Sequence, residues 1–94
     1  MRMSDRLDEL RQRFRDRAAT QAVELEDALR TGDNACLSQI AHRLSGSGGT
    51  FGYPEIGRLA ETVERSVDAE LSTTQLRCVV RPLIEAIRHM SQVA

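Results

Sequence analysis

The chain has 94 residues, of which 40% are hydrophobic and only 3% are aromatic. A chain of this length folds as one domain around a single modest core, and a core poor in aromatic rings suits packed helices rich in Leu, Ile, Val and Ala. The formal net charge of −1 excludes a bulk electrostatic attraction for nucleic acid or for an anionic membrane.

The cysteines and the hydrophobic pattern bear on the cellular compartment. Cys36 and Cys78 are the only cysteines, and no apolar run resembles a signal peptide or a membrane span. Two isolated cysteines in such a chain are typical of reduced thiols. We therefore expect a cytoplasmic protein without a disulfide bond, either free-standing or as one domain of a longer chain.

Residues 4–30 are predicted to be helical. Their apolar positions recur at intervals of three and four, which describes one face of an α-helix. These positions are Leu7, Leu10, Phe14, Ala18, Ala22, Leu25, Ala28 and Leu29. Ser4 suits the N-cap and Gly32 suits the C-terminal stop. The pattern leaves open whether this segment is one helix or two with a bend near residues 17–21.

Two further amphipathic segments follow. The first is capped by Asp33 or Asn34 and ends before Gly52, and Pro54 suits the first turn of the next helix. Its inner side carries Leu37, Ile40, Ala41, Leu44 and Gly48. The stripe of the following helix consists of Ile56, Leu59, Ala60, Val63 and Val67.

The start of the last helix is predicted from Ser72 and Gln75, whose spacing matches a capping box. Pro82 lies within its apolar pattern, so we expect a kink or break near residues 78–82. No segment alternates with the period of a strand, and the connections are short. We therefore predict an all-α fold, an antiparallel up-and-down four-helix bundle formed by residues 1–94 as a single domain.

One histidine is predicted to face solvent. At about 100° per residue, His42 lies about 140° from Leu37, the centre of the buried side of its helix. Gly46 and Gly49 fall beside it, one and two turns on, so the ring stands clear and a partner can approach it closely. Gly48 falls on the buried side, where it permits a neighbouring helix to pack tightly.

The stretch around this histidine, "AHRLSGSGGTFGYPEIGRLAETVE" (residues 41–64), resembles the signature of histidine-containing phosphotransfer domains. The residues that carry the resemblance are His42, Leu44, Gly46, Ser47, Gly52, Leu59, Ala60 and Glu64. The chain departs from the family at Ser45, where many members have lysine.

The resemblance implies a phosphorelay intermediate, a phosphocarrier that is not an enzyme in its own right. His42 is then the phosphoacceptor, taking a phosphoryl group from a receiver-domain aspartate and passing it to another response regulator. Gln39, Arg43 and Ser45 are expected to support the ring or the phosphate, and Ser38, Gly46 and Gly49 to form the docking surface. We expect no metal or cofactor in this chain, because the Mg²⁺ would lie in the receiver.

Other interpretations are weaker. A nucleotide-binding loop follows a strand and ends in Lys-Ser or Lys-Thr, whereas "GSGGTFG" follows a helix and has no lysine. Cys36 and His42 are about 240° apart on a helix, which excludes a shared metal ion. Two alternatives remain open: an adaptor or sequestering module that takes no phosphate, and a domain of a hybrid or chemotaxis-type histidine kinase. The expected partners are receiver domains, with no nucleic acid and no membrane, and the expected state is a monomer.

Overall fold

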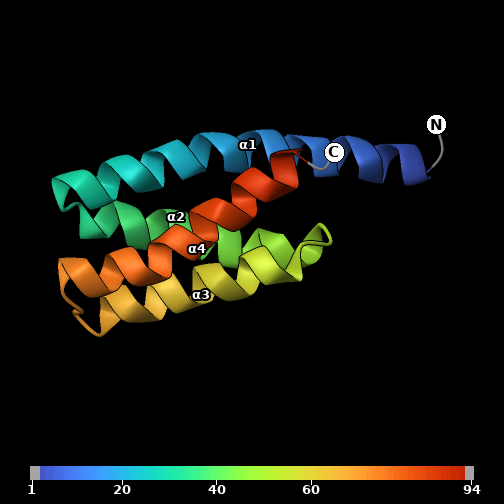
Figure 1. Cartoon of the computed structure of the whole chain (residues 1–94). Helices are drawn as coiled ribbons and strands as arrows, with labels where there is room; N and C mark the ends of the chain where they lie inside the picture. Colours follow the sequence, from blue (N-terminus) through green and yellow to red (C-terminus); the bar gives the residue numbers. More distant parts are fainter. Residues whose placement is uncertain (1–2, 93–94) are drawn as a thin grey trace.

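A computed structural model describes residues 3–92 of the chain. This part of the chain contains four α-helices and no strand: α1 (Met3–Thr31), α2 (Asn34–Thr50), α3 (Pro54–Asp68) and α4 (Thr73–Gln92). Successive helices run in opposite directions (Figure 1). Helix α1 packs against α2 and α4, and α3 packs against the same two helices. The predicted all-α, up-and-down four-helix bundle is confirmed.

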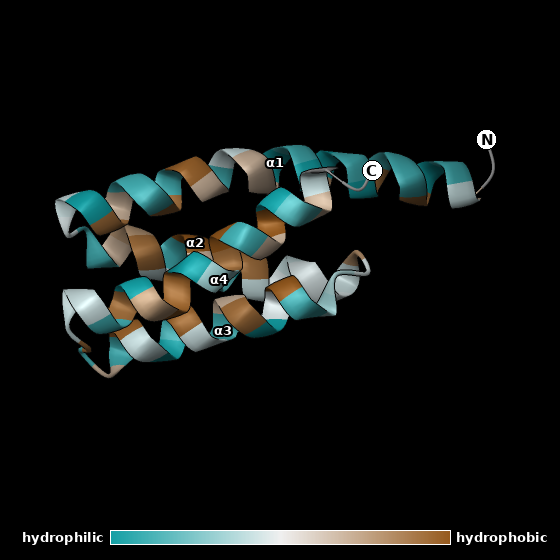
Figure 2. Cartoon of the chain, viewed as in Figure 1, coloured by the Kyte–Doolittle hydropathy of each residue, from teal (hydrophilic) through white to brown (hydrophobic). Residues whose placement is uncertain are grey.

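The core forms where the apolar stripes of the four helices meet, and Figure 2 shows the hydrophobic segments gathered between the helices. The largest fully buried side chains are Leu25, Leu37, Leu44, Leu76, Leu83, Ile87, Val63 and Val80. All five residues predicted on the inner side of α2 are buried. In α3, Leu59 and Val67 are only half-buried, but both pack against the core.

Helix α1 is one continuous helix, without an interruption near residues 17–21. Its 29 residues correspond to about 43 Å, whereas the 17 residues of α2 correspond to about 25 Å. The N-terminal turns of α1 therefore extend beyond the end of the bundle (Figure 1). Leu7, predicted on the apolar face, is 42% exposed for this reason: no other helix reaches it within the described residues.

Most helix ends follow the signals in the sequence. The exception is Ser4, predicted as an N-cap, which lies inside α1 because the helix already includes Met3. Gly32 adopts a φ of +73°, which favours glycine, directly after α1. Asp33 caps α2, because its Oδ1 accepts a hydrogen bond of 3.1 Å from the backbone N–H of Cys36. Ser72 and Gln75 form the predicted capping box at α4: the backbone N–H of each donates to the side chain of the other, at 3.0 and 3.2 Å.

Pro82 does not break α4, which continues through it to Gln92. The sequence predicted a kink or a break here, and of these the break is wrong, because α4 is one helix from Thr73 to Gln92. Pro82 and Cys78, four residues earlier, both lie on the exposed side of the helix, so the carbonyl that loses its proline partner faces water. On the opposite side, Val80, Leu83 and Ile84 are buried in the core and hold both halves of the helix in place.

Candidate functional site

The site is built on the tight contact between α2 and α3. Gly48 is buried, and a Cβ placed on it would lie 2.7 Å from the backbone nitrogen of Gly57 and 2.9 Å from the carbonyl oxygen of Tyr53. Only a residue without a side chain permits this approach. The predicted packing role of Gly48 is confirmed, and the close approach brings the outer faces of α2 and α3 together.

His42 lies on the outer face of α2, as the helix period predicts. Its side chain is 76% exposed. A Cβ added to Gly46 or to Gly49 would meet no atom within 4 Å. The surface next to the ring is therefore flat and open, and a partner can reach the imidazole without displacing a side chain from these two positions.

Glu64 of α3 contacts this histidine. Its Oε2 lies 2.9 Å from His42 Nδ1, and the carboxylate is only 26% exposed whereas the imidazole is largely in solvent. An ionised carboxylate can only accept a hydrogen bond, so Nδ1 carries the proton in this contact. In a neutral ring the other nitrogen, Nε2, then keeps its lone pair and points away from the acid.

Ser45 joins the same group of side chains. Its hydroxyl lies 2.9 Å from the carbonyl oxygen of His42, which is three residues earlier, and 3.3 Å from Oε1 of Glu64. The single hydroxyl proton is shared between these two acceptors. Ser45 therefore contacts the second oxygen of the carboxylate whose first oxygen holds the histidine.

The other residues singled out from the sequence lie on the same helix without joining this group. Gln39 and Arg43 are exposed, and Ser38 is half-buried. Among the hydrogen bonds of residues 3–92, none involves the side chain of Ser38, Gln39 or Arg43. The structure thus brings together His42, Ser45 and Glu64.

Sequence reasoning missed the contact of Glu64 with the imidazole, although Glu64 belongs to the signature. The contact joins residues 22 positions apart on different helices, so the spacing within one helix does not reveal it. One signal in the sequence could have indicated this contact. Glu64 directly follows the buried Val63, so it lies at the edge of the face with which α3 contacts α2.

This arrangement suits nucleophilic chemistry at an imidazole. The Nε2 lone pair of a neutral, exposed imidazole can act as a nucleophile, and a carboxylate next to Nδ1 can stabilise the positive charge that such a ring gains when Nε2 forms a bond. Within residues 3–92, no group of three or more His, Cys, Asp or Glu side chains is placed to hold a metal ion.

Comparison with protein families identifies the family to which the chain belongs. The sequence model of the Hpt domain matches residues 9–92, which is nearly the whole chain. The chain belongs to the Hpt family. As an Hpt domain it is a phosphotransfer-type signalling module and a phosphocarrier, and Hpt domains interact with receiver domains.

Two further comparisons gave no relative: neither the curated proteins nor the solved structures contain a match. None of the helices in the described part of the chain combines the length and the apolar character that crossing a membrane requires.

Proposed function

We propose that this Hpt domain is a phosphorelay intermediate in which Nε2 of His42 accepts a phosphoryl group from the aspartyl phosphate of one receiver and returns it to the aspartate of another. The observation that supports this most strongly is the contact between Nδ1 of His42 and Oε2 of Glu64, at 2.9 Å, behind a ring that is 76% exposed. In a neutral ring this contact keeps the proton on Nδ1 and leaves the lone pair on Nε2.

The transfer step follows from this geometry. The Nε2 lone pair attacks phosphorus, an N–P bond forms, and the P–O bond to the receiver aspartate breaks, so that the aspartate leaves as a carboxylate. The proton stays on Nδ1. The ring becomes positively charged as the N–P bond forms, and the negative charge of Glu64, 2.9 Å from Nδ1, stabilises that charge during and after the transfer.

Ser45 acts through Glu64 in this proposal. Its hydroxyl holds Oε1 while Oε2 holds the ring, so the carboxylate has both oxygens engaged. Many Hpt domains have lysine at this position, whereas this chain has a neutral donor. Gln39 and Arg43 remain candidates for contacts with the phosphoryl oxygens, because both are exposed on α2 near the histidine.

The receiver docks on the flat surface of α2 in this proposal, over Gly46, Gly49 and the edge at Ser38. The receiver supplies the Mg²⁺ that neutralises the transferring phosphoryl group, and this chain supplies the nucleophile and its orientation. Because both cysteines are free, a reducing compartment suits the protein, and we place the relay in the cytoplasm.

The test is phosphotransfer from a panel of receivers whose aspartates carry labelled phosphate. We expect the chain to take up label that is labile in acid and stable in base, as a phosphoramidate is, and we expect His42→Ala to take up none. His89→Gln is the matched control, because it removes the other histidine and should leave the uptake unchanged. Uptake by His42→Ala equal to that of the wild type, or no uptake from any receiver, would refute the proposal.

A further inference from the structure

The N-terminal turns of α1 carry an apolar stripe that the bundle does not cover. Met3, Leu7 and Leu10 continue the row of Phe14 and Ala18, which are buried in the core. Met3 is 82% and Leu7 is 42% exposed, and Leu10 is half-buried without packing against the core. This part of the helix therefore has the pattern of a buried face but no partner among the described residues.

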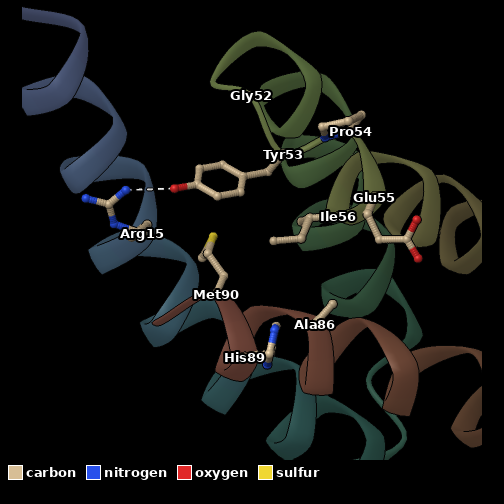
Figure 3. Close-up of a pocket in the computed structure, with 9 residues that line it drawn as sticks. All are labelled: Arg15, Gly52, Tyr53, Pro54, Glu55, Ile56, Ala86, His89 and Met90. Carbon is tan, nitrogen blue, oxygen red and sulfur yellow. Dashed lines mark hydrogen bonds between the residues drawn. The ribbon is translucent and has the colours of Figure 1, made fainter. Parts of the chain in front are cut away.

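A hollow adjoins the stripe at the open end of the bundle. It has a volume of about 600 Å³, and α1, α3, α4 and the α2–α3 connection all contribute to its lining. Figure 3 shows Tyr53, Ile56 and Met90 around its centre, with Arg15 at one side. The carboxylate of Glu55 points away from these residues and pairs with Arg58 at 2.7 Å.

The stripe and the hollow form one surface. Phe14, at the inner end of the stripe, packs its ring on that of Tyr53 with centroids 5.4 Å apart. The next residue, Arg15, lines the hollow and donates a hydrogen bond of 2.7 Å to the hydroxyl of Tyr53. We call the stripe of Met3, Leu7 and Leu10 together with this hollow the N-terminal corner.

Positive charge borders the stripe on both sides. At about 100° per residue, Arg6 and Arg13 flank it on one side and Arg11 on the other, each within about 90° of its centre. The acidic residues of this part of α1 all lie more than about 120° from the centre: they are Asp5, Asp8, Glu9 and Asp16.

Ion pairs with acidic residues of the same helix do not neutralise the arginines that border the stripe. Arg11 lies 3.7 Å from Asp8, and Arg13 lies 3.5 Å from Glu9. Exposed pairs of this kind contribute about 0–1 kcal/mol and yield readily to a better partner. The corner therefore presents apolar side chains framed by arginines that remain available to a docked acid.

This charge pattern argues against a second copy of the chain as the occupant. Two copies laid antiparallel along the stripe would bring Arg6 of each helix close to Arg13 of the other, and like charges at the edges of a helix pair oppose association. A stripe with intervals of three and four packs best on another helix of the same periodicity.

We propose that the N-terminal corner is a docking site for an amphipathic helix of a partner protein whose apolar stripe is bordered by Asp and Glu. The helix lies along Met3, Leu7 and Leu10 and inserts apolar side chains into the hollow beside Tyr53 and Met90. Its acidic residues pair with the arginines on either side. The stripe and the lining of the hollow include no residue of α2, so such a partner leaves the surface at His42 free.

The test uses two synthetic helical peptides of about 18 residues, or five turns, with leucines at intervals of three and four. One has glutamates bordering the leucines and the other has lysines at the same positions. We expect the glutamate peptide to bind and to shift the amide resonances of residues 3–15, 52, 53, 55, 56 and 86–90 in the ¹⁵N-labelled chain. The lysine peptide should bind at least about tenfold more weakly, a difference of about 1.4 kcal/mol.

Variants separate the parts of the site. Leu7→Gln should weaken binding of the glutamate peptide about tenfold. Val23→Gln, at another exposed apolar position of α1 (56%, against 42% for Leu7), should leave it unchanged. The double charge reversal Arg6→Glu with Arg13→Glu should reverse the preference toward the lysine peptide. Neither Leu7 nor Val23 is buried, so both variants should keep the fold.

Three results would overturn the proposal. The first is equal binding, or no binding, of both peptides. The second is self-association of the wild-type chain in sedimentation equilibrium that Leu7→Gln abolishes, which would make the corner a dimer interface. The third is binding to vesicles of phosphatidylcholine and phosphatidylglycerol that Leu7→Gln abolishes, without peptide binding, which would make it a membrane-surface site.

Discussion

His42 and Glu64 are joined across the α2–α3 contact, with Nδ1 of the imidazole 2.9 Å from Oε2 of the carboxylate. The histidine is the exposed partner and the glutamate the sheltered one. The partly buried carboxylate therefore positions the exposed ring. Our account of phosphotransfer depends on this relationship, because it decides which nitrogen is free to react.

Glu64→Gln tests the charge of the carboxylate separately from its position. The amide oxygen can still accept the Nδ1 hydrogen bond, but the negative charge that stabilises the charged ring is lost. Hydrogen bonds to charged groups exceed neutral ones by about 1 kcal/mol, so transfer from a phosphorylated receiver should slow about fivefold. Glu85→Gln, on the exposed side of α4, is the matched control. An unchanged rate in Glu64→Gln would contradict the assigned role.

Gly46→Gln tests the flat docking surface. A Cβ at Gly46 meets no atom within 4 Å, so the variant should fold, but its side chain would stand beside His42 where a receiver approaches. Transfer from a receiver should slow by about tenfold or more, equivalent to about 1.4 kcal/mol. Labelling of His42 by phosphoramidate, a small donor, should stay the same. Ala19→Gln, also exposed on a helix, is the control, and a parallel loss with both donors would point to a damaged histidine instead.

Replacing Gly48 or Gly49 of α2 by alanine should change the free energy of unfolding in opposite directions. Gly48→Ala places a methyl group 2.7 Å from the backbone of Gly57, and such overpacking should lower the free energy of unfolding by about 1–3 kcal/mol. Gly49→Ala places the methyl group in open space within the same helix, and should raise it by about 0.5–1 kcal/mol. Urea denaturation measures both. Equal effects of the two substitutions would mean that the α2–α3 contact is looser than described.

Cys36 should be slow to alkylate. Burial raises the pKa of its thiol, and the carboxylates of Asp33 and Glu24 raise it further. At a pH near the ordinary pKa of a cysteine, less of Cys36 is therefore thiolate in the folded chain than in the unfolded chain. In a Cys78→Ser background, iodoacetamide should react more slowly with the native protein than with the urea-unfolded protein, and the native rate should keep rising to higher pH. Equal alkylation rates in the native and the unfolded protein would contradict a raised pKa of the Cys36 thiol.

The sequence predicted what depends on one helix at a time. The direction of His42 and the burial of Leu37 and Gly48 follow from the helix period alone, and Ser72 with Gln75 follows from local capping chemistry. Glu64 was different, because its contact with His42 depends on how α2 and α3 are aligned. The close approach of Gly48 to Gly57 fixes that alignment, and no periodicity within either helix contains it.

At Leu7 and at Pro82 the structure also differs from the sequence-based prediction, and in both cases the cause is packing between helices. Leu7 fits the apolar face of α1, but whether it is covered depends on how far the other three helices reach. Pro82 lacks a backbone donor, which favours a break, yet the burial of Val80, Leu83 and Ile84 keeps α4 continuous. In both cases the tertiary packing, and not the local sequence, decides the outcome.

The central claim is tested most directly by locating the phosphoryl group on the imidazole. NMR of the ¹⁵N-labelled, phosphorylated chain resolves which ring nitrogen is bonded to phosphorus. Our account predicts a bond to Nε2 of His42, with Nδ1 still protonated toward Glu64. A phosphoryl group on Nδ1 of His42, or on His89, would contradict it.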